Sequence, residues 1–173
     1  SVTVLGETTG SRAVTRSGAQ PGDWIIVTGN LGGSLVGGHL NFRPRVHEAM
    51  QLHANVELHA MIDLSDGLAR DLHHVLAESG VGAVLESESI PISQFVQDAD
   101  DSRSPLEHAL CDGEDFELLF TLSESDGAKL LADSPIDVPI SHIGHIVEGE
   151  GCQIRDLNGK LVSLPIGGWE HLF

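Results

Sequence analysis

The chain has 173 residues, 40% of them hydrophobic, and a formal net charge of −17 at pH 7. This length fits one domain, or one domain with an additional arm, and the apolar content is sufficient for a buried core. The negative charge disfavours binding to nucleic acid or anionic membranes, and its simplest explanation is solubility. The sequence contains no apolar run of about eighteen residues and no secretory signal pattern at its start, so neither a transmembrane helix nor a signal peptide is expected.

Cysteine and histidine usage gives no sign of a disulfide framework or a zinc site. Cys111 and Cys152 lie far apart and form no C-x-x-C motif. We therefore expect a reducing, cytoplasmic setting with both as small core residues. The ten histidines match no zinc spacing such as H-x-x-x-H or H-E-x-x-H.

Strand and helix signals are mixed along the chain, which favours an α+β fold over a regular βαβ array. The clearest helix covers residues 66–79, where apolar residues recur at helical spacing and Gly80 provides the stop. Further helices are predicted at residues 44–59, 105–110 and 124–132. Strands are predicted at residues 2–6, 24–28, 60–62, 81–86, 114–122, 140–147, 153–155 and 160–164, with an exposed loop over residues 94–104.

Residues 29–38 (G-N-L-G-G-S-L-V-G-G) form a glycine-rich segment. Backbone N–H groups of such a segment can cradle a phosphate. However, the segment matches neither the P-loop nor the dinucleotide-binding fingerprint. We favour the interpretation that it is a loop leading into a closely packed helix.

The run Asp63-Leu64-Ser65-Asp66-Gly67-Leu68 carries the sharpest chemical signal. A predicted strand ends at Asp63 and a helix begins near Asp66, so two carboxylates and a hydroxyl meet at the positive end of a helix. Magnesium binds one or two carboxylates together with water and phosphate oxygens, and Ser65 can donate to a phosphate. An ordinary helix N-cap would explain part of the run, and both interpretations remain open on physical grounds.

Residues 112–120 (D-G-E-D-F-E-L-L-F) open with four acidic residues and then become apolar. If the segment is extended from its start, Glu114 and Phe116 lie on one face and Asp115 and Glu117 on the other. Buried unpaired carboxylates are costly, so these are expected at the exposed end of a strand, either solvated or in a site or interface.

Near the C-terminal end, two glycines precede Trp169 in the run G-G-W-E-H-L-F. The indole ring could anchor the tail by burial, or it could stack on a flat or cationic ligand. The local sequence does not decide between these two roles.

Taken together, these segments resemble one family over nearly the whole chain. The motifs that carry the resemblance are R-S-G-A-Q-P-G-D (16–23), I-V-T-G-N-L-G-G-S (26–34), P-R-V (44–46), M-I-D-L-S-D-G-L (61–68), D-G-E-D-F-E-L-L-F (112–120) and G-W-E-H-L-F (168–173). The chain resembles the C-terminal half of the thiamine-monophosphate kinase family, within the aminoimidazole-ribonucleotide-synthetase-like superfamily. This resemblance implies a layered α/β/α sandwich with a mixed sheet, like the C-terminal domain of aminoimidazole ribonucleotide synthetase.

The resemblance also implies an activity: transfer of the ATP γ-phosphoryl group to thiamine monophosphate, giving thiamine diphosphate, with Mg²⁺ required. By position, Asp63 and Asp66 match magnesium ligands and Ser65 matches an ATP contact. Glu114 and Trp169 match contacts to the cationic substrate. No residue is implied as a covalent catalyst or general base, because the acceptor phosphate is already anionic.

Residues 1–10 resemble the last strand of an N-terminal ATP- and metal-binding domain, and residues 11–173 the C-terminal kinase domain. The chain alone is therefore expected to lack kinase activity, and the full-length protein to be a homodimer. Asp112 stands where the family usually has a glycine. Two alternatives remain: a superfamily relative acting on another phosphorylated substrate, and a non-catalytic binding or dimerisation module.

Overall fold

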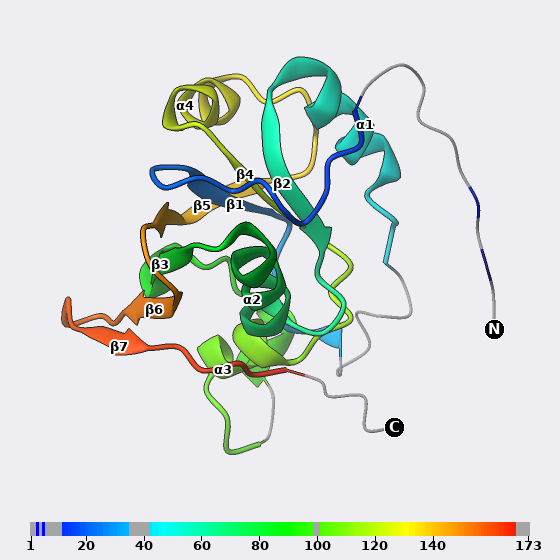
Figure 1. The fold of residues 1–173 in the computed structure, drawn as a ribbon. Helices are drawn as coiled ribbons and strands as arrows, with labels where there is room; N and C mark the ends of the chain where they lie inside the picture. Colours follow the sequence, from blue (N-terminus) through cyan, green and yellow to red (C-terminus); the bar gives the residue numbers. More distant parts are fainter. Residues whose placement is uncertain (1–2, 4, 6–11, 35–41, 99–100, 169–173) are drawn as a thin grey trace.

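The computed structural model describes residues 3, 5, 12–34, 42–98 and 101–168. A seven-stranded mixed sheet lies between two layers of helices, with α1 and α4 on one face and α2 and α3 on the other (Figure 1). The strand order is β2-β4-β1-β5-β3-β6-β7. Only the β3–β6 pair is parallel among these named strands. The predicted layered sandwich with a mixed sheet is therefore confirmed.

Seven strands and four α-helices make up the described part of this fold. The strands are β1 (Trp24–Thr28), β2 (Leu58–Asp63), β3 (Gly82–Glu86), β4 (Leu118–Leu122), β5 (Ile140–Val147), β6 (Gly151–Arg155) and β7 (Leu161–Ser163). The helices are α1 (Val46–Asn55), α2 (Leu68–Ser79), α3 (Pro105–Cys111) and α4 (Glu124–Ala132), with short 3-10 helices η3 (Ser87–Ser89) and η4 (Gln94–Asp98). None of the described helices is both long and apolar enough to cross a bilayer.

Two hydrophobic cores fill the spaces on either side of the sheet. In the central strand β1, Ile25 and Val27 belong to the core under α2 and α3, whereas Ile26 belongs to the core under α1 and α4. This division follows from the period-two alternation of side chains along a strand. On α2, Leu68 and Leu72 are completely buried, and each contributes roughly 1.5–3 kcal/mol through burial.

Most predicted elements agree with the structure, and the differences lie at their ends. The helix predicted at 44–59 ends at Asn55, because Val56 is extended and β2 starts at Leu58. Part of the predicted exposed loop at 94–104 is the 3-10 helix η4, in which Val96 is buried. The strand predicted at residues 2–6 falls largely outside the described residues.

The strand predicted at 114–122 is wrong in its first half, since β4 begins only at Leu118. Glu114 and Phe116 have left-handed backbones, with φ of +53° and +51°, and so do not extend a strand. Their N–H groups instead bond to carbonyls of the turn between β2 and α2. Tertiary hydrogen bonds therefore outweigh the local alternation of the sequence.

Candidate functional site

The turn between β2 and α2 presents the residues of the run 63–68 at the carboxyl end of β2. Ser65 Oγ donates a hydrogen bond to the carboxylate of Asp63. Gly67 has a φ of +108°, a conformation that glycine adopts without steric cost, and α2 begins at the next residue. The residues predicted as a magnesium–nucleotide turn, Asp63, Ser65 and Asp66, thus lie together at the N-terminal end of a helix.

A buried carboxylate below this turn fixes its shape. Asp71 Oδ2 accepts hydrogen bonds from the backbone N–H groups of Ser65 and Asp66, each at 2.9 Å. Burial raises the pKa of Asp71 to about 6, and the neighbouring charges of Asp66 and Asp63 add to that rise. Although Asp71 is a charged residue of α2, it is only 3% exposed.

The donor set at this turn fits a hard cation better than zinc. Asp63 is exposed and Asp66 half-buried, so neither carboxylate is closed off from solvent, and Mg²⁺ is an ion that usually keeps several waters. Asp66, Asp71 and His74 also carry ligand atoms that all lie within 4.8 Å of one another. That second grouping shares Asp66 with the predicted pair. Asp71 already accepts two backbone hydrogen bonds, so its role in the turn is accounted for without an ion.

The acidic segment 112–117 lies directly against this turn and is bonded to it by three backbone hydrogen bonds. Glu114 N–H donates to Ser65 O at 2.8 Å, and Phe116 N–H donates to Leu64 O at 2.9 Å. Leu64 N–H in turn donates to Glu117 O at 2.8 Å. The exposed Glu114 is therefore held next to Ser65, although about fifty residues separate them in sequence.

Glu117 is buried and paired, whereas the sequence analysis expected it at the exposed end of a strand, either solvated or in a site or interface. Its carboxylate accepts two hydrogen bonds from the Arg45 guanidinium, at 2.7 and 2.8 Å, and one from Thr28 Oγ1 at 2.6 Å. Thr28 Oγ1 accepts from Leu118 N–H at 2.9 Å. This pairing joins the end of β1 and the start of α1 to β4. A bidentate arginine partner offsets the desolvation cost of burying the carboxylate.

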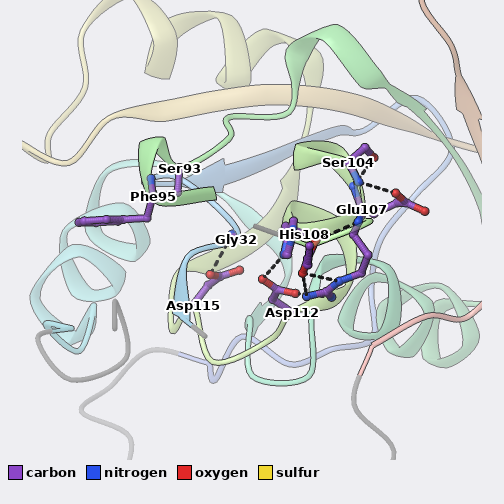
Figure 2. A network of polar contacts seen from close by, with 10 residues as sticks. Gly32, Ser93, Phe95, Ser104, Glu107, His108, Asp112 and Asp115 are labelled. Atoms are coloured by element: carbon purple, nitrogen blue, oxygen red, sulfur yellow. Dashed lines mark hydrogen bonds and ion pairs between the residues drawn. The ribbon is translucent and has the colours of Figure 1, made fainter. Parts of the chain in front are cut away.

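A pocket of about 640 Å³ opens beside Glu114, between the glycine-rich segment and the start of α1. Gly32 N–H donates to Asp115 Oδ1 at 3.0 Å, which ties the glycine-rich segment to the acidic one (Figure 2). Burial raises the pKa of Asp115 to about 7. The pocket also presents the exposed aromatic rings of Phe42 and Phe95.

The first part of the glycine-rich segment packs closely against its neighbours and lines this pocket. A Cβ on Gly32 would lie 2.7 Å from Ala109 N, and a Cβ on Gly29 would lie 2.1 Å from Glu117 Oε1. Residues 35–41, which include the end of this segment, lie outside the described part of the chain.

The C-terminal segment reaches the same turn. A Cβ on Gly168 would lie 2.1 Å from Asp66 O, so the chain passes against the turn at this residue. Trp169, the predicted substrate contact, lies outside the described residues.

The structure brings together Asp63, Ser65, Asp66 and Glu114, and it adds Asp71, Arg45, Asp115 and Glu117. Only an acidic residue near a helix start hinted at Asp71, and Arg45 had no local signal beyond the P-R-V motif.

Comparison with known proteins identifies the family. Residues 20–156 match the family described as AIR synthase related protein, C-terminal domain. The chain belongs to this family. This chain is 43% identical over 173 residues to the thiamine-monophosphate kinase of Rhodopirellula baltica, covering 99% of this chain and 54% of that protein. It is 36% identical to the Escherichia coli K12 thiamine-monophosphate kinase, covering 92% and 55% respectively.

Solved structures agree with this family assignment. The Stenotrophomonas maltophilia K279a thiamine-monophosphate kinase superposes with a TM-score of 0.70 at 31% identity, covering 86% of this chain and 54% of that one. A structure of AaThiL complexed with AMPPCP and TMP gives 0.65 at 29% identity, covering 92% and 54%. A hydrogenase maturation protein HypE shares the fold at a TM-score of 0.77 and 20% identity, covering 96% and 60%. The chain spans about half the length of the curated kinases it matches.

Proposed function

We propose that this chain is the C-terminal half of an ATP-dependent kinase that phosphorylates thiamine monophosphate to thiamine diphosphate. The observation that carries the proposal is the bonding of Glu114 to the Asp63–Asp66 turn, which holds the acidic Glu114 next to Ser65 at the start of α2. The similarity to thiamine-monophosphate kinases, including a structure complexed with AMPPCP and TMP, supports these substrates.

In this proposal the turn faces the phosphates and Glu114 faces the organic part of the acceptor. Asp63 and Asp66 would hold Mg²⁺, which neutralises phosphate charge when it is bound. Ser65 would donate a hydrogen bond to the nucleotide. Glu114 and Trp169 would contact the cationic thiazolium, one through its charge and the other through its ring face. Catalysis then consists of positioning and charge stabilisation, with no general base.

The proposal includes a domain division. Residues 1–10 would be the last strand of an N-terminal domain that supplies further metal and ATP contacts, and residues 11–173 the C-terminal kinase domain. The isolated chain is then expected to have no turnover. A homodimer of the complete polypeptide in the cytoplasm is part of the same proposal, supported there by two free cysteines, one half-buried and one buried.

Substitution of the turn carboxylates tests the proposal. Asp63→Asn and Asp66→Asn in the complete polypeptide should each lower kcat/KM for thiamine monophosphate by about 100-fold or more, since each removes a fixed charge that acts on the transferred phosphate. Asp133→Asn is the control, because it removes an exposed carboxylate at the end of α4.

The activities of these variants distinguish the remaining alternatives. Unchanged turnover in both Asn variants would favour a non-catalytic module and contradict the assigned roles. If wild type acts on an aminoimidazole precursor but not on thiamine monophosphate, and the Asn variants lose that activity, the site acts on another phosphorylated substrate.

A further inference from the structure

Asp112, at the C-terminal end of α3, is held by basic side chains on both of its carboxylate oxygens. Oδ1 accepts from Arg103 Nη1 at 2.7 Å, and Oδ2 lies 2.8 Å from His108 Nδ1. The Asp112 side chain is only 1% exposed. Figure 2 shows His108 and Asp112 facing each other, beside the helix start formed by Ser104 and Glu107.

A fourth residue closes these contacts into a ring. Asp101 Oδ2 lies 3.3 Å from Arg103 Nη2, and Asp101 Oδ1 lies 3.2 Å from His108 Nε2. Both nitrogens of the His108 imidazole therefore face carboxylate oxygens, which accept hydrogen bonds. In this closed set of contacts, two acidic residues alternate with two basic ones. We name this set, Asp101, Arg103, His108 and Asp112, the α3 clasp.

Helix stability alone does not account for a carboxylate in this position. The C-terminal end of a helix carries a partial negative charge, so a carboxylate there is unfavourable unless cations offset it. Arg103 and His108 supply these basic partners here. The clasp therefore gives the chain a point of attachment directly before Gly113.

The residues that follow Asp112 lead directly into the site. Gly113 and Glu114 both have left-handed backbones, with φ of +71° and +53°. For a residue other than glycine this conformation is unfavourable and persists only where its surroundings hold it. Glu114 is held on its N–H side by Ser65 O, and the segment is held before Gly113 by the clasp.

We propose that Asp112 is a positioning residue, which through the α3 clasp fixes the Gly113–Glu114 turn and so sets the direction of the Glu114 carboxylate. The part of this inference that concerns binding rests on the proposed role of Glu114 toward a cationic acceptor. The part that concerns the turn does not, since it depends only on the contacts of Asp112.

Asp112→Asn and Arg103→Gln test the inference in the complete polypeptide. The first keeps the shape of the side chain and removes its charge, and the second removes one partner. Each should speed hydrogen exchange of the Glu114 amide about tenfold and raise KM for thiamine monophosphate about five- to tenfold, leaving KM for ATP within about twofold. Glu107→Gln is the matched control, because it weakens the capping box of the same helix, in which Glu107 bonds to Ser104, a residue outside the clasp.

The KM for thiamine monophosphate and the hydrogen exchange of the Glu114 amide test different parts of the argument. If wild type does not phosphorylate thiamine monophosphate, the proposed function is wrong, and exchange of the Glu114 amide still tests the clasp. If Asp112→Asn and Arg103→Gln leave that exchange unchanged, the inference is wrong. It is also wrong if Glu107→Gln reproduces both the faster exchange and the rise in KM, because Asp112 would then serve only the stability of α3.

Discussion

Replacing Gly113 with alanine perturbs the contact between the two segments of the site at a single point. Gly113 has a φ of +71°, and a Cβ added there would lie 2.7 Å from Ser65 O. Gly80, at the end of α2, has nearly the same φ of +67° with nothing within 4 Å of its added Cβ. The two substitutions therefore impose the same backbone strain and differ only in crowding.

The expected magnitudes follow from these distances. A left-handed alanine costs about 1–2 kcal/mol at either position. At Gly113 the added Cβ must move about 0.7 Å to reach an ordinary contact of 3.4 Å. Overpacking of that kind costs about 1–3 kcal/mol. Loss of the Glu114 N–H bond to Ser65 O adds about 1 kcal/mol. Gly113→Ala should thus cost roughly 3–6 kcal/mol and Gly80→Ala about 1–2 kcal/mol.

Urea unfolding of the complete polypeptide, followed for wild type and both variants, measures this difference. Hydrogen exchange of the Glu114 amide reports whether its bond to Ser65 is lost. Equal destabilisation by Gly113→Ala and Gly80→Ala would refute the reasoning, since crowding against Ser65 would then have no energetic effect.

Three further predictions concern buried groups. Burial raises the pKa of Asp115 to about 7, above its ordinary 3.8, so folding favours the protonated carboxyl. The contribution of this group to the free energy of unfolding is complete below about pH 4 and is lost as pH rises through about 7. The free energy of unfolding of Asp115→Asn should therefore rise relative to that of wild type between about pH 4 and pH 8, by at most about 4 kcal/mol in urea unfolding. A difference between the two proteins that does not change with pH would contradict this prediction. Glu117→Ala leaves Arg45 without its bidentate partner and should lower the free energy of unfolding by about 3–5 kcal/mol. The double variant with Arg45→Met should lose less than Glu117→Ala alone, and a double variant that loses as much or more would argue against coupling of the two residues. Burial raises the pKa of Cys152 to about 12, so iodoacetamide should leave it unmodified in the native protein at pH 8, and rapid labelling would show that it is accessible.

The sequence predicted those parts of the fold that depend on local patterns. The helix at 124–132 and the strand at 140–147 have the predicted bounds, since each combines a clear period with end signals such as Ser123. The conformations of Glu114 and Phe116 could not be predicted in this way, because carbonyls about fifty residues earlier impose them. Within the site, the turn at 63–66 follows from a strand end meeting a helix start.

The burial of charged groups was the least predictable feature. Glu117 and Arg45 are 72 residues apart, and neither has a local signal that names the other as its partner. Asp71 lies in a polar stretch of α2, yet it is buried because the preceding turn folds back over it. Such pairs depend on the tertiary fold, which periodicity along one element does not contain.

The position of β1 in the sheet has a consequence during protein synthesis. β1 is central, but its two neighbours are β4 and β5, which follow it by about 95 and 115 residues. At about 5–20 residues per second, the ribosome needs roughly 5–20 s to make β4 after β1. The apolar run Ile25-Ile26-Val27 emerges long before its partners, so in this interval a chaperone must shield it or it is open to aggregation.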